Sequence, residues 1–278
     1  MRSHHPRKQF AQHWLRNPGA LGQIVKAAQL STPDRILEIG PGKGVLTAQL
    51  LTFSQSVIAV EIDRDLCKGL EKKFQTSENF LLLQGDILEL DLDQALAEFP
   101  QFQTPNKVVA NIPYNITGPI LEKLLGTIAQ PAERPFDLIV LLVQKEVAQR
   151  LAAQPGSKIF GALSVRVQYL ATCELICEVP AKSFYPPPKV DSAVIRLRPQ
   201  LTQPTAQDPK HLSSLVRAGF VSKRKMLRNN LKSLINRDDL TQILEELGID
   251  PQARAEDVGV AQWVTLSNRL LELEKAQP

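Results

Sequence analysis

The chain has 278 residues, of which 43% are hydrophobic, and this length suits one large α/β domain with a small appendage. No apolar run approaches the ~20 residues of a membrane-spanning helix, and the N-terminus lacks the apolar segment of a signal peptide, so we expect a cytoplasmic protein. Three cysteines do not make a disulfide framework, and since no histidine lies near Cys173 or Cys177 we expect no metal site.

The net charge of +4 is unevenly distributed along the chain. The first acidic residue is Asp34, and five Lys or Arg residues precede it. Residues 210–237 contain eight Lys or Arg and no acid. Basic segments on both sides of a balanced middle indicate a polyanionic partner such as RNA or DNA. A solvated basic face is the alternative.

Short apolar runs alternate with helix-like segments in the first half of the chain. The predicted strands are Arg35–Ile39, Val57–Glu61, Phe80–Gln84, Val108–Ala110 and Leu138–Val143. This spacing predicts βαβ units and a parallel, doubly wound sheet. Two later runs, Cys173–Val179 and Ala193–Leu197, flank a proline-rich segment, and we expect them to pair antiparallel at the sheet edge.

A change in composition follows the last predicted strand. Residues 199–209 are rich in proline and predict a linker between a catalytic domain, 1–198, and a helical domain, 210–278. Apolar residues at helical spacing predict a first helix through 216–234 that carries a basic face, followed by two further helices.

A glycine-rich loop follows the first predicted strand. Gly40, Gly42 and Gly44 allow a tight turn and a close approach of the backbone to a ligand. Glu61 ends the second strand and is placed to bind ribose hydroxyls, while Asp86, after the third strand, is placed to accept from an adenine amine. The glycine pattern alone also fits a dinucleotide-dependent oxidoreductase.

The stretch 111–114, Asn-Ile-Pro-Tyr, follows the fourth strand and predicts N6-adenine methyl transfer. The Asn111 side-chain oxygen and the next main-chain carbonyl can each accept one N6 hydrogen, which directs the nitrogen lone pair at a methyl donor. Tyr114 would stack on the extruded base, a contact worth ~1–3 kcal/mol. Phe184, in a proline-stiffened segment, is the candidate second wall, with Tyr185 as the alternative. A proline turn that merely ends a strand is the structural alternative for the whole stretch.

Taken in order, these motifs resemble those of the KsgA/RsmA-type small-subunit (16S) rRNA adenine dimethylase family. The matching segments span nearly the whole chain: Gln12–Leu15, Glu38–Thr47, Val60–Asp63, Gly85–Leu88, Asn111–Thr117, Phe184–Val194, Arg217–Phe220 and Lys223–Leu231. The resemblance implies a class I, Rossmann-like methyltransferase with a mostly parallel seven-stranded sheet and a small all-α C-terminal domain. It also implies S-adenosylmethionine as the cofactor and dimethylation of N6 on two adjacent adenosines in the 3′-terminal hairpin loop of small-subunit rRNA, within the assembling 30S subunit. We expect a monomer.

The resemblance also implies roles for individual residues. The implied catalytic residues are Asn111, Tyr114 and Phe184. The implied cofactor-binding residues are His13, Leu15, Gly40, Gly42, Glu61, Ile62, Asp86, Ile87 and Asn111. The implied RNA-binding residues are Arg217, Lys223, Arg224, Lys225, Arg228 and Lys232.

The chain departs from the family pattern at His13 and Trp14, where the family usually has Asn and Phe. A histidine still donates and accepts hydrogen bonds, and a tryptophan keeps an aromatic lid. Related macrolide-resistance enzymes, which methylate a large-subunit adenosine, share the 111–114 loop, but segments 184–194 and 223–231 are closer to the dimethylase pattern. A protein that acts mainly as an RNA-binding assembly checkpoint is a further hypothesis.

Overall fold

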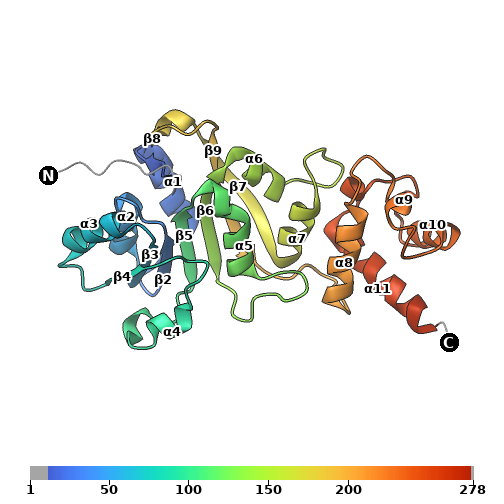
Figure 1. Cartoon of the computed structure of the whole chain (residues 1–278), viewed down its shortest axis with the longest axis horizontal. Helices are drawn as coiled ribbons and strands as arrows, with labels where there is room; N and C mark the ends of the chain where they lie inside the picture. Colours follow the sequence, from blue (N-terminus) through green and yellow to red (C-terminus); the bar gives the residue numbers. More distant parts are fainter. Residues whose placement is uncertain (1–11, 277–278) are drawn as a thin grey trace. The chain divides into compact units, whose positions relative to one another are not determined.

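The structure is a computed structural model whose description covers residues 12–276 (Figure 1). Of the basic residues that precede Asp34, Arg2, Arg7 and Lys8 lie outside this range, and Arg16 and Lys26 lie within it. The chain forms two compact units, which are described separately. Unit 1 comprises Met1–Leu124, Arg134–Ala148 and Glu174–Pro199, and unit 2 comprises Leu125–Glu133, Gln149–Cys173 and Gln200–Pro278.

A seven-stranded sheet with the order β4-β3-β2-β5-β6-β9-β7 forms the centre of unit 1. Five neighbouring strands are parallel: β2 (Arg35–Ile39), β3 (Ser56–Glu61), β4 (Phe80–Gln84), β5 (Lys107–Asn111) and β6 (Leu138–Gln144). β9 (Ser192–Pro199) runs antiparallel to β6, and β7 (Ala171–Val179) completes the edge. The predicted strands are confirmed, and β7 and β9 lie side by side at the sheet edge, whereas their antiparallel pairing stays a prediction.

Helices connect the strands of unit 1. They are α1 (Pro18–Ala28), α2 (Val45–Phe53), α3 (Arg64–Phe74), α4 (Leu92–Leu96), α5 (Thr117–Leu125) and α6 (Lys145–Leu151). Short 3-10 turns occur at Pro100–Phe102, Tyr114–Ile116 and Ala181–Ser183. The Asn17 side chain caps α1 by accepting from the Ala20 amide, and Pro18 suits the first helical turn because it has no N–H to satisfy. Ile24 of α1 and Leu50 of α2 are completely buried in one cluster with side chains of the sheet.

A separate two-stranded ribbon joins the start of the described chain to the proline-rich segment. β1 (Trp14–Leu15) pairs antiparallel with β8 (Phe184–Tyr185). The Arg16 amide continues the pairing by donating to the Ser183 carbonyl at 2.8 Å. The ribbon therefore fixes the residues just before α1 against a segment about 170 positions later in the chain.

Unit 2 is largely helical. Its helices are α7 (Ala162–Leu170), α8 (Pro209–Gly219), α9 (Leu227–Asn230), α10 (Arg237–Glu246) and α11 (Val260–Ala276), with a 3-10 turn at Ala255–Asp257. α11 packs against α7, α8 and α10, and its Trp263 is completely buried. Across residues 12–276, no helix has the length and apolar character needed to cross a membrane.

The predicted helix through 216–234 is wrong. α8 ends at Gly219, residues 220–226 form turns, and only Leu227–Asn230 is helical again. A Cβ on Gly219 would lie 2.3 Å from the Trp263 ring, so the chain passes the tryptophan at a residue without a side chain. The Asn230 side-chain amide then donates to the carbonyls of Gly219 at 2.6 Å and Ser222 at 3.0 Å, which holds the turn in place of a continued helix.

The segment predicted as a linker is hydrogen-bonded within unit 2. The Gln200 and Thr202 amides donate to the carbonyls of Leu170 and Tyr169, and the Gln207 amide donates to the Asn268 side chain at 2.8 Å. Unit 2 also includes Gln149–Cys173, because α7 packs against α8 and α11. The boundaries of these units differ from the predicted domain boundaries at residues 198 and 210. The division into a catalytic domain and a helical domain at those positions stays a prediction.

Candidate active site

The glycine loop between β2 and α2 presents bare backbone to a cavity. Gly40, Gly42 and Gly44 have φ angles of 67°, 58° and 67°, a left-handed conformation that disfavours side chains. A Cβ on Gly44 would lie 2.6 Å from Phe74, and one on Gly42 would lie 3.0 Å from Trp14. The loop therefore depends on glycine both for its turn and for the space around it.

Glu61 and Asp86 lie at the carboxyl ends of adjacent parallel strands and line the same cavity. The Glu61 carboxylate accepts from the Gly42 amide at 3.1 Å and from the Asp63 amide at 3.0 Å, and its side chain is buried. Burial raises the pKa of Glu61, while the two amide bonds oppose that rise. The Asp86 carboxylate accepts from the Leu88 amide at 2.9 Å. Each carboxylate retains lone pairs that can accept from the hydroxyl or amine of a ligand.

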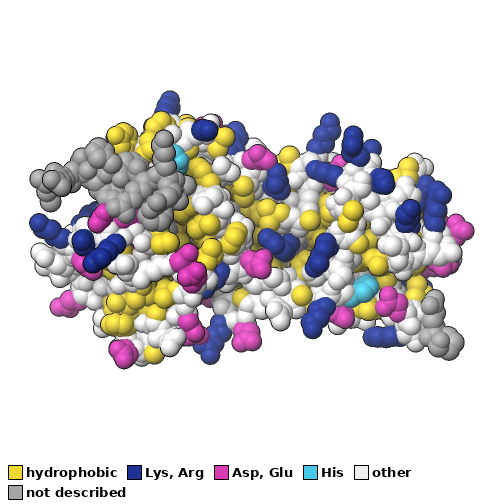
Figure 2. Space-filling view, viewed as in Figure 1, with side chains coloured by type: hydrophobic (Ala, Val, Ile, Leu, Met, Phe, Trp, Pro, Cys, Tyr) yellow, Lys and Arg dark blue, Asp and Glu magenta, His cyan; other side chains and the backbone are white. Residues whose placement is uncertain are grey.

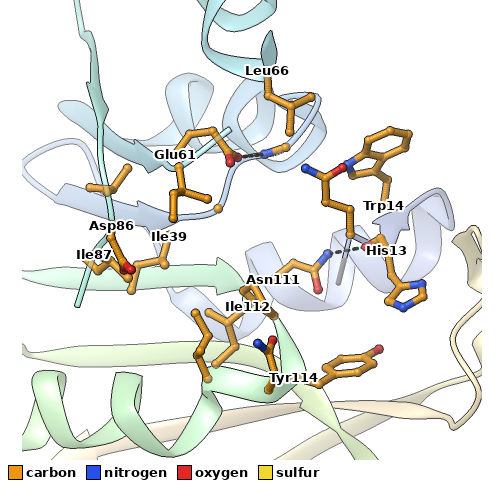
Figure 3. Close-up of a pocket in the computed structure, with 18 of the residues that line it drawn as sticks. His13, Trp14, Ile39, Glu61, Leu66, Asp86, Ile87, Asn111, Ile112 and Tyr114 are labelled. Carbon is orange, nitrogen blue, oxygen red and sulfur yellow. Dashed lines mark hydrogen bonds between the residues drawn. The ribbon is translucent and has the colours of Figure 1, made fainter. Parts of the chain in front are cut away.

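Asn111 is the last residue of β5, and a 3-10 turn begins at Tyr114. The Asn111 side-chain nitrogen donates to the main-chain oxygen of His13 at 3.2 Å. Because a carbonyl can only accept, the amide nitrogen of Asn111 faces His13. Its oxygen, Oδ1, is then available as an acceptor in the cavity wall (Figure 3). The Tyr114 hydroxyl is hydrogen-bonded to the buried Ser192 at 2.6 Å, and burial raises the pKa of that hydroxyl.

The β1 strand lies at the edge of the cavity. Trp14 is buried beside Gly42, and the Lys43 ammonium lies 3.9 Å from the centre of the indole ring. His13 lines the cavity, and its Nδ1 is hydrogen-bonded to the Pro186 carbonyl at 2.7 Å. The neighbouring Leu15 is buried in the hydrophobic core and does not line the cavity.

The cavity has a volume of about 310 Å³, within the range of small-molecule sites. Figure 3 shows Asp86 on one side and Tyr114 on the other. The cavity brings together nearly all of the implied cofactor and catalytic residues: His13, Gly40, Gly42, Glu61, Ile62, Asp86, Ile87, Asn111 and Tyr114. Sequence reasoning missed the cavity-lining Leu66, which α3 contributes next to the capping residue Asp63.

The structure places Phe184 away from this group. Its side chain is only 4% exposed, packs in the core cluster with Leu15 and Ile24, and does not line the cavity. Tyr185, the alternative, is 43% exposed, and the Arg16 guanidinium lies 4.0 Å from its ring centre. The stacking role of Phe184 stays a prediction.

The implied RNA-binding residues belong to unit 2. Arg217, Lys223, Arg224, Lys225 and Lys232 are exposed, whereas Arg228 is half-buried. They lie on the end of α8, on the 220–226 turn, on α9 and just beyond it, so they form no single helical stripe. Figure 2 shows Lys and Arg side chains gathered over α8 and α9. Lys223 is held by the Lys158 carbonyl and by the Glu256 carboxylate at 3.4 Å, which fixes one end of the basic turn.

Comparisons with known proteins agree on one family. The sequence matches the ribosomal RNA adenine dimethylase family over residues 3–272. It is 67% identical over 265 residues to "Ribosomal RNA small subunit methyltransferase A" of Trichormus variabilis, covering 95% of this chain and 98% of that one. The protein of the same name from Synechocystis is 57% identical, with 95% and 96% coverage.

Two solved structures share the fold over almost the entire chain. A dimethyladenosine transferase from Plasmodium falciparum superposes with a TM-score of 0.77 and 28% identity, covering 95% of this chain and 98% of that one. The 23S rRNA methyltransferase ErmE superposes with a TM-score of 0.73 and 27% identity, with 92% and 99% coverage. With these matches and the class I methyltransferase sheet, the chain belongs to the ribosomal RNA adenine dimethylase family.

Proposed function

We propose that this protein transfers methyl groups from S-adenosylmethionine to N6 of two adjacent adenosines in the 3′-terminal hairpin loop of small-subunit rRNA. The observation that carries the proposal is the orientation of Asn111. Its side-chain nitrogen is committed to the His13 carbonyl, so the acceptor oxygen is the end available to an incoming amine.

Adenine N6 is a poor nucleophile because its lone pair is delocalised into the ring. The Asn111 oxygen and the Ile112 carbonyl accept the two N6 hydrogens, which holds the nitrogen in a geometry that frees the lone pair for attack. Tyr114 stacks on the base, and its hydroxyl bond to Ser192 restrains the ring. No strong general base is needed, because the nitrogen becomes acidic as it gains a bond to carbon and solvent can take the proton.

The cavity fits the cofactor. Its glycine loop offers backbone without side chains, Glu61 and Asp86 offer carboxylates to hydroxyl and amine donors, and Ile62 and Ile87 offer apolar walls for an adenine ring. When bound there, S-adenosylmethionine supplies an electrophilic methyl group. The described residues 12–276 contain no group of three or more His, Cys, Asp or Glu side chains arranged to hold a metal, and the proposed reaction uses none.

The small ribosomal subunit is the favoured substrate. Curated relatives with 57% to 67% identity carry the name small subunit methyltransferase, whereas the 23S enzyme is 27% identical. The exposed basic residues of unit 2 suit an RNA partner, since phosphate contacts dominate such binding. We also propose a cytoplasmic monomer that acts on the assembling subunit.

An assembly-checkpoint role can coexist with methyl transfer, and Asn111→Ala separates the two. Methyl transfer should fall by about 10²-fold or more, as when a preorganised polar contact to the reacting group is removed, while subunit binding stays within about twofold. A filter assay with labelled S-adenosylmethionine measures the first, and sedimentation with small subunits the second. Retained transfer at the wild-type rate would contradict the proposed site.

A further inference from the structure

His13 touches three separate parts of the site. Its ring nitrogen Nδ1 lies 2.7 Å from the Pro186 carbonyl, its ring stacks on Tyr114 with centroids 5.9 Å apart and an interplanar angle of 18°, and its main-chain oxygen accepts from Asn111. Figure 3 shows the imidazole projecting toward Tyr114 rather than toward Glu61 and Asp86. The side chain thus faces the predicted base-binding end of the cavity, although its position in the family motif implies a cofactor contact.

The hydrogen bond to Pro186 requires a hydrogen on Nδ1 of the His13 ring. Because a carbonyl oxygen only accepts, Nδ1 carries the hydrogen and donates it. The imidazole is therefore anchored to the segment that follows β8, two residues beyond Phe184.

Tyr114 makes two contacts that restrain its side chain. Ser192, buried at the start of β9, holds the hydroxyl end at 2.6 Å, and the His13 imidazole is stacked against the ring with centroids 5.9 Å apart. With Cβ fixed by the backbone and the hydroxyl held by Ser192, the ring can still rotate about the axis that joins them. A stacked neighbour that is itself hydrogen-bonded to Pro186 opposes that rotation.

We propose that His13 is a positioning residue for the target adenine. Its imidazole holds the Tyr114 ring and the Pro186 segment in one arrangement, and its main-chain oxygen sets the Asn111 amide with the acceptor outward. The inference rests on the proposed N6-adenine methyl transfer. It assigns the side chain to base placement and gives it no part in cofactor affinity.

Two substitutions at this position test the assignment, because each retains the main-chain oxygen that binds Asn111. His13→Ala removes the ring and the donor, whereas His13→Phe retains a stacking ring and loses only the bond to Pro186. We expect His13→Ala to lower kcat on under-methylated small subunits about tenfold, the scale of one aromatic contact plus one hydrogen bond. His13→Phe should recover at least about threefold of that loss, since stacking is the larger part.

The affinity for S-adenosylhomocysteine, measured by calorimetry, provides the second readout and should stay within about twofold in both variants, as for a side chain without a cofactor contact. Equal kcat losses in the two variants, a loss confined to cofactor affinity, or no loss at all would overturn the inference. Thermal unfolding monitors folding. If His13→Ala does not fold, His13→Phe decides alone: a lowered kcat with unchanged affinity for S-adenosylhomocysteine supports the inference, and a loss confined to that affinity overturns it. A wild-type protein that fails to methylate small subunits would instead refute the proposed function.

Discussion

Replacing Glu61 with glutamine tests how the cavity holds a cofactor. Both carboxylate oxygens already accept a backbone amide, from Gly42 at 3.1 Å and from Asp63 at 3.0 Å. In Glu61→Gln, one oxygen becomes an NH₂ group that must face one of those N–H donors, and the remaining acceptor is uncharged. A hydrogen bond to a charged group contributes about 1.5–3 kcal/mol, so the cofactor Kd should rise about 10- to 150-fold.

The donor-to-donor contact inside the buried site should also lower the unfolding free energy of the cofactor-free protein, by about 1–3 kcal/mol. Calorimetric titration with S-adenosylhomocysteine measures the first effect, and urea unfolding measures the second. Glu78→Gln, the same substitution at an exposed position outside the cavity, is the matched control and should change neither. A folded Glu61→Gln protein with a Kd within about twofold of wild type would refute the role of Glu61 as a cofactor acceptor.

The pH dependence of binding follows from the same residue. Burial raises the pKa of Glu61, and the ionised form is the one that accepts two amides and a ligand hydroxyl. Cofactor affinity should therefore weaken as pH falls through this raised pKa, and Glu61→Gln should remove that dependence. An unchanged pH profile in Glu61→Gln would assign the dependence to another group.

Three further outcomes are expected. Burial raises the pKa of Glu38 to about 8, so its contribution to stability is complete below the unfolded-state pKa of 4.5 and is lost as pH rises toward 8. In Glu38→Gln, the unfolding free energy measured in urea should no longer fall over this pH range. A pH profile parallel to that of the wild type would contradict this prediction. Gly44→Ala places a Cβ 2.6 Å from the Phe74 ring and should lower the unfolding free energy by about 2–4 kcal/mol. Gly248→Ala has a similar left-handed φ but open space around it, and should cost about 1–2 kcal/mol. Equal losses in the two variants would exclude the clash at Gly44. Combined reversal of Arg224 and Lys225 to Glu should weaken RNA binding more at low salt and reduce the log–log salt slope by up to about 2, and an unchanged slope would place the turn away from phosphate.

The sheet was predictable because its strands are short, apolar and separated by helical spacings. Arg35–Ile39 and Phe80–Gln84 have the predicted bounds, and the others differ by one or two residues at their ends. The site was predictable for the same reason, since Glu61 and Asn111 are the last residues of parallel strands whose carboxyl ends meet at one edge of the sheet. Local pattern and parallel topology together determine where these side chains lie.

Other features depend on contacts that no local pattern contains. The spacing of Val216, Phe220 and Leu227 fits a helix, but Trp263 of α11 and the Asn230 side chain stop it at Gly219. Phe184, which the proline-rich segment predicted as a base-stacking residue, is likewise buried where β8 pairs with β1, and His13, next to β1, stacks with Tyr114. These contacts join residues that are far apart in sequence, so they emerge only in the folded chain.

The central claim is tested most directly by mapping methylated nucleotides. Small and large ribosomal subunits that lack the modification are incubated with the protein and labelled S-adenosylmethionine, and the labelled bases are located by primer extension and nuclease mapping. The account predicts N6,N6-dimethyladenosine at two adjacent adenosines of the small-subunit 3′ hairpin and no label in the large subunit. Label only in large-subunit rRNA, or binding to small subunits without label, would contradict it.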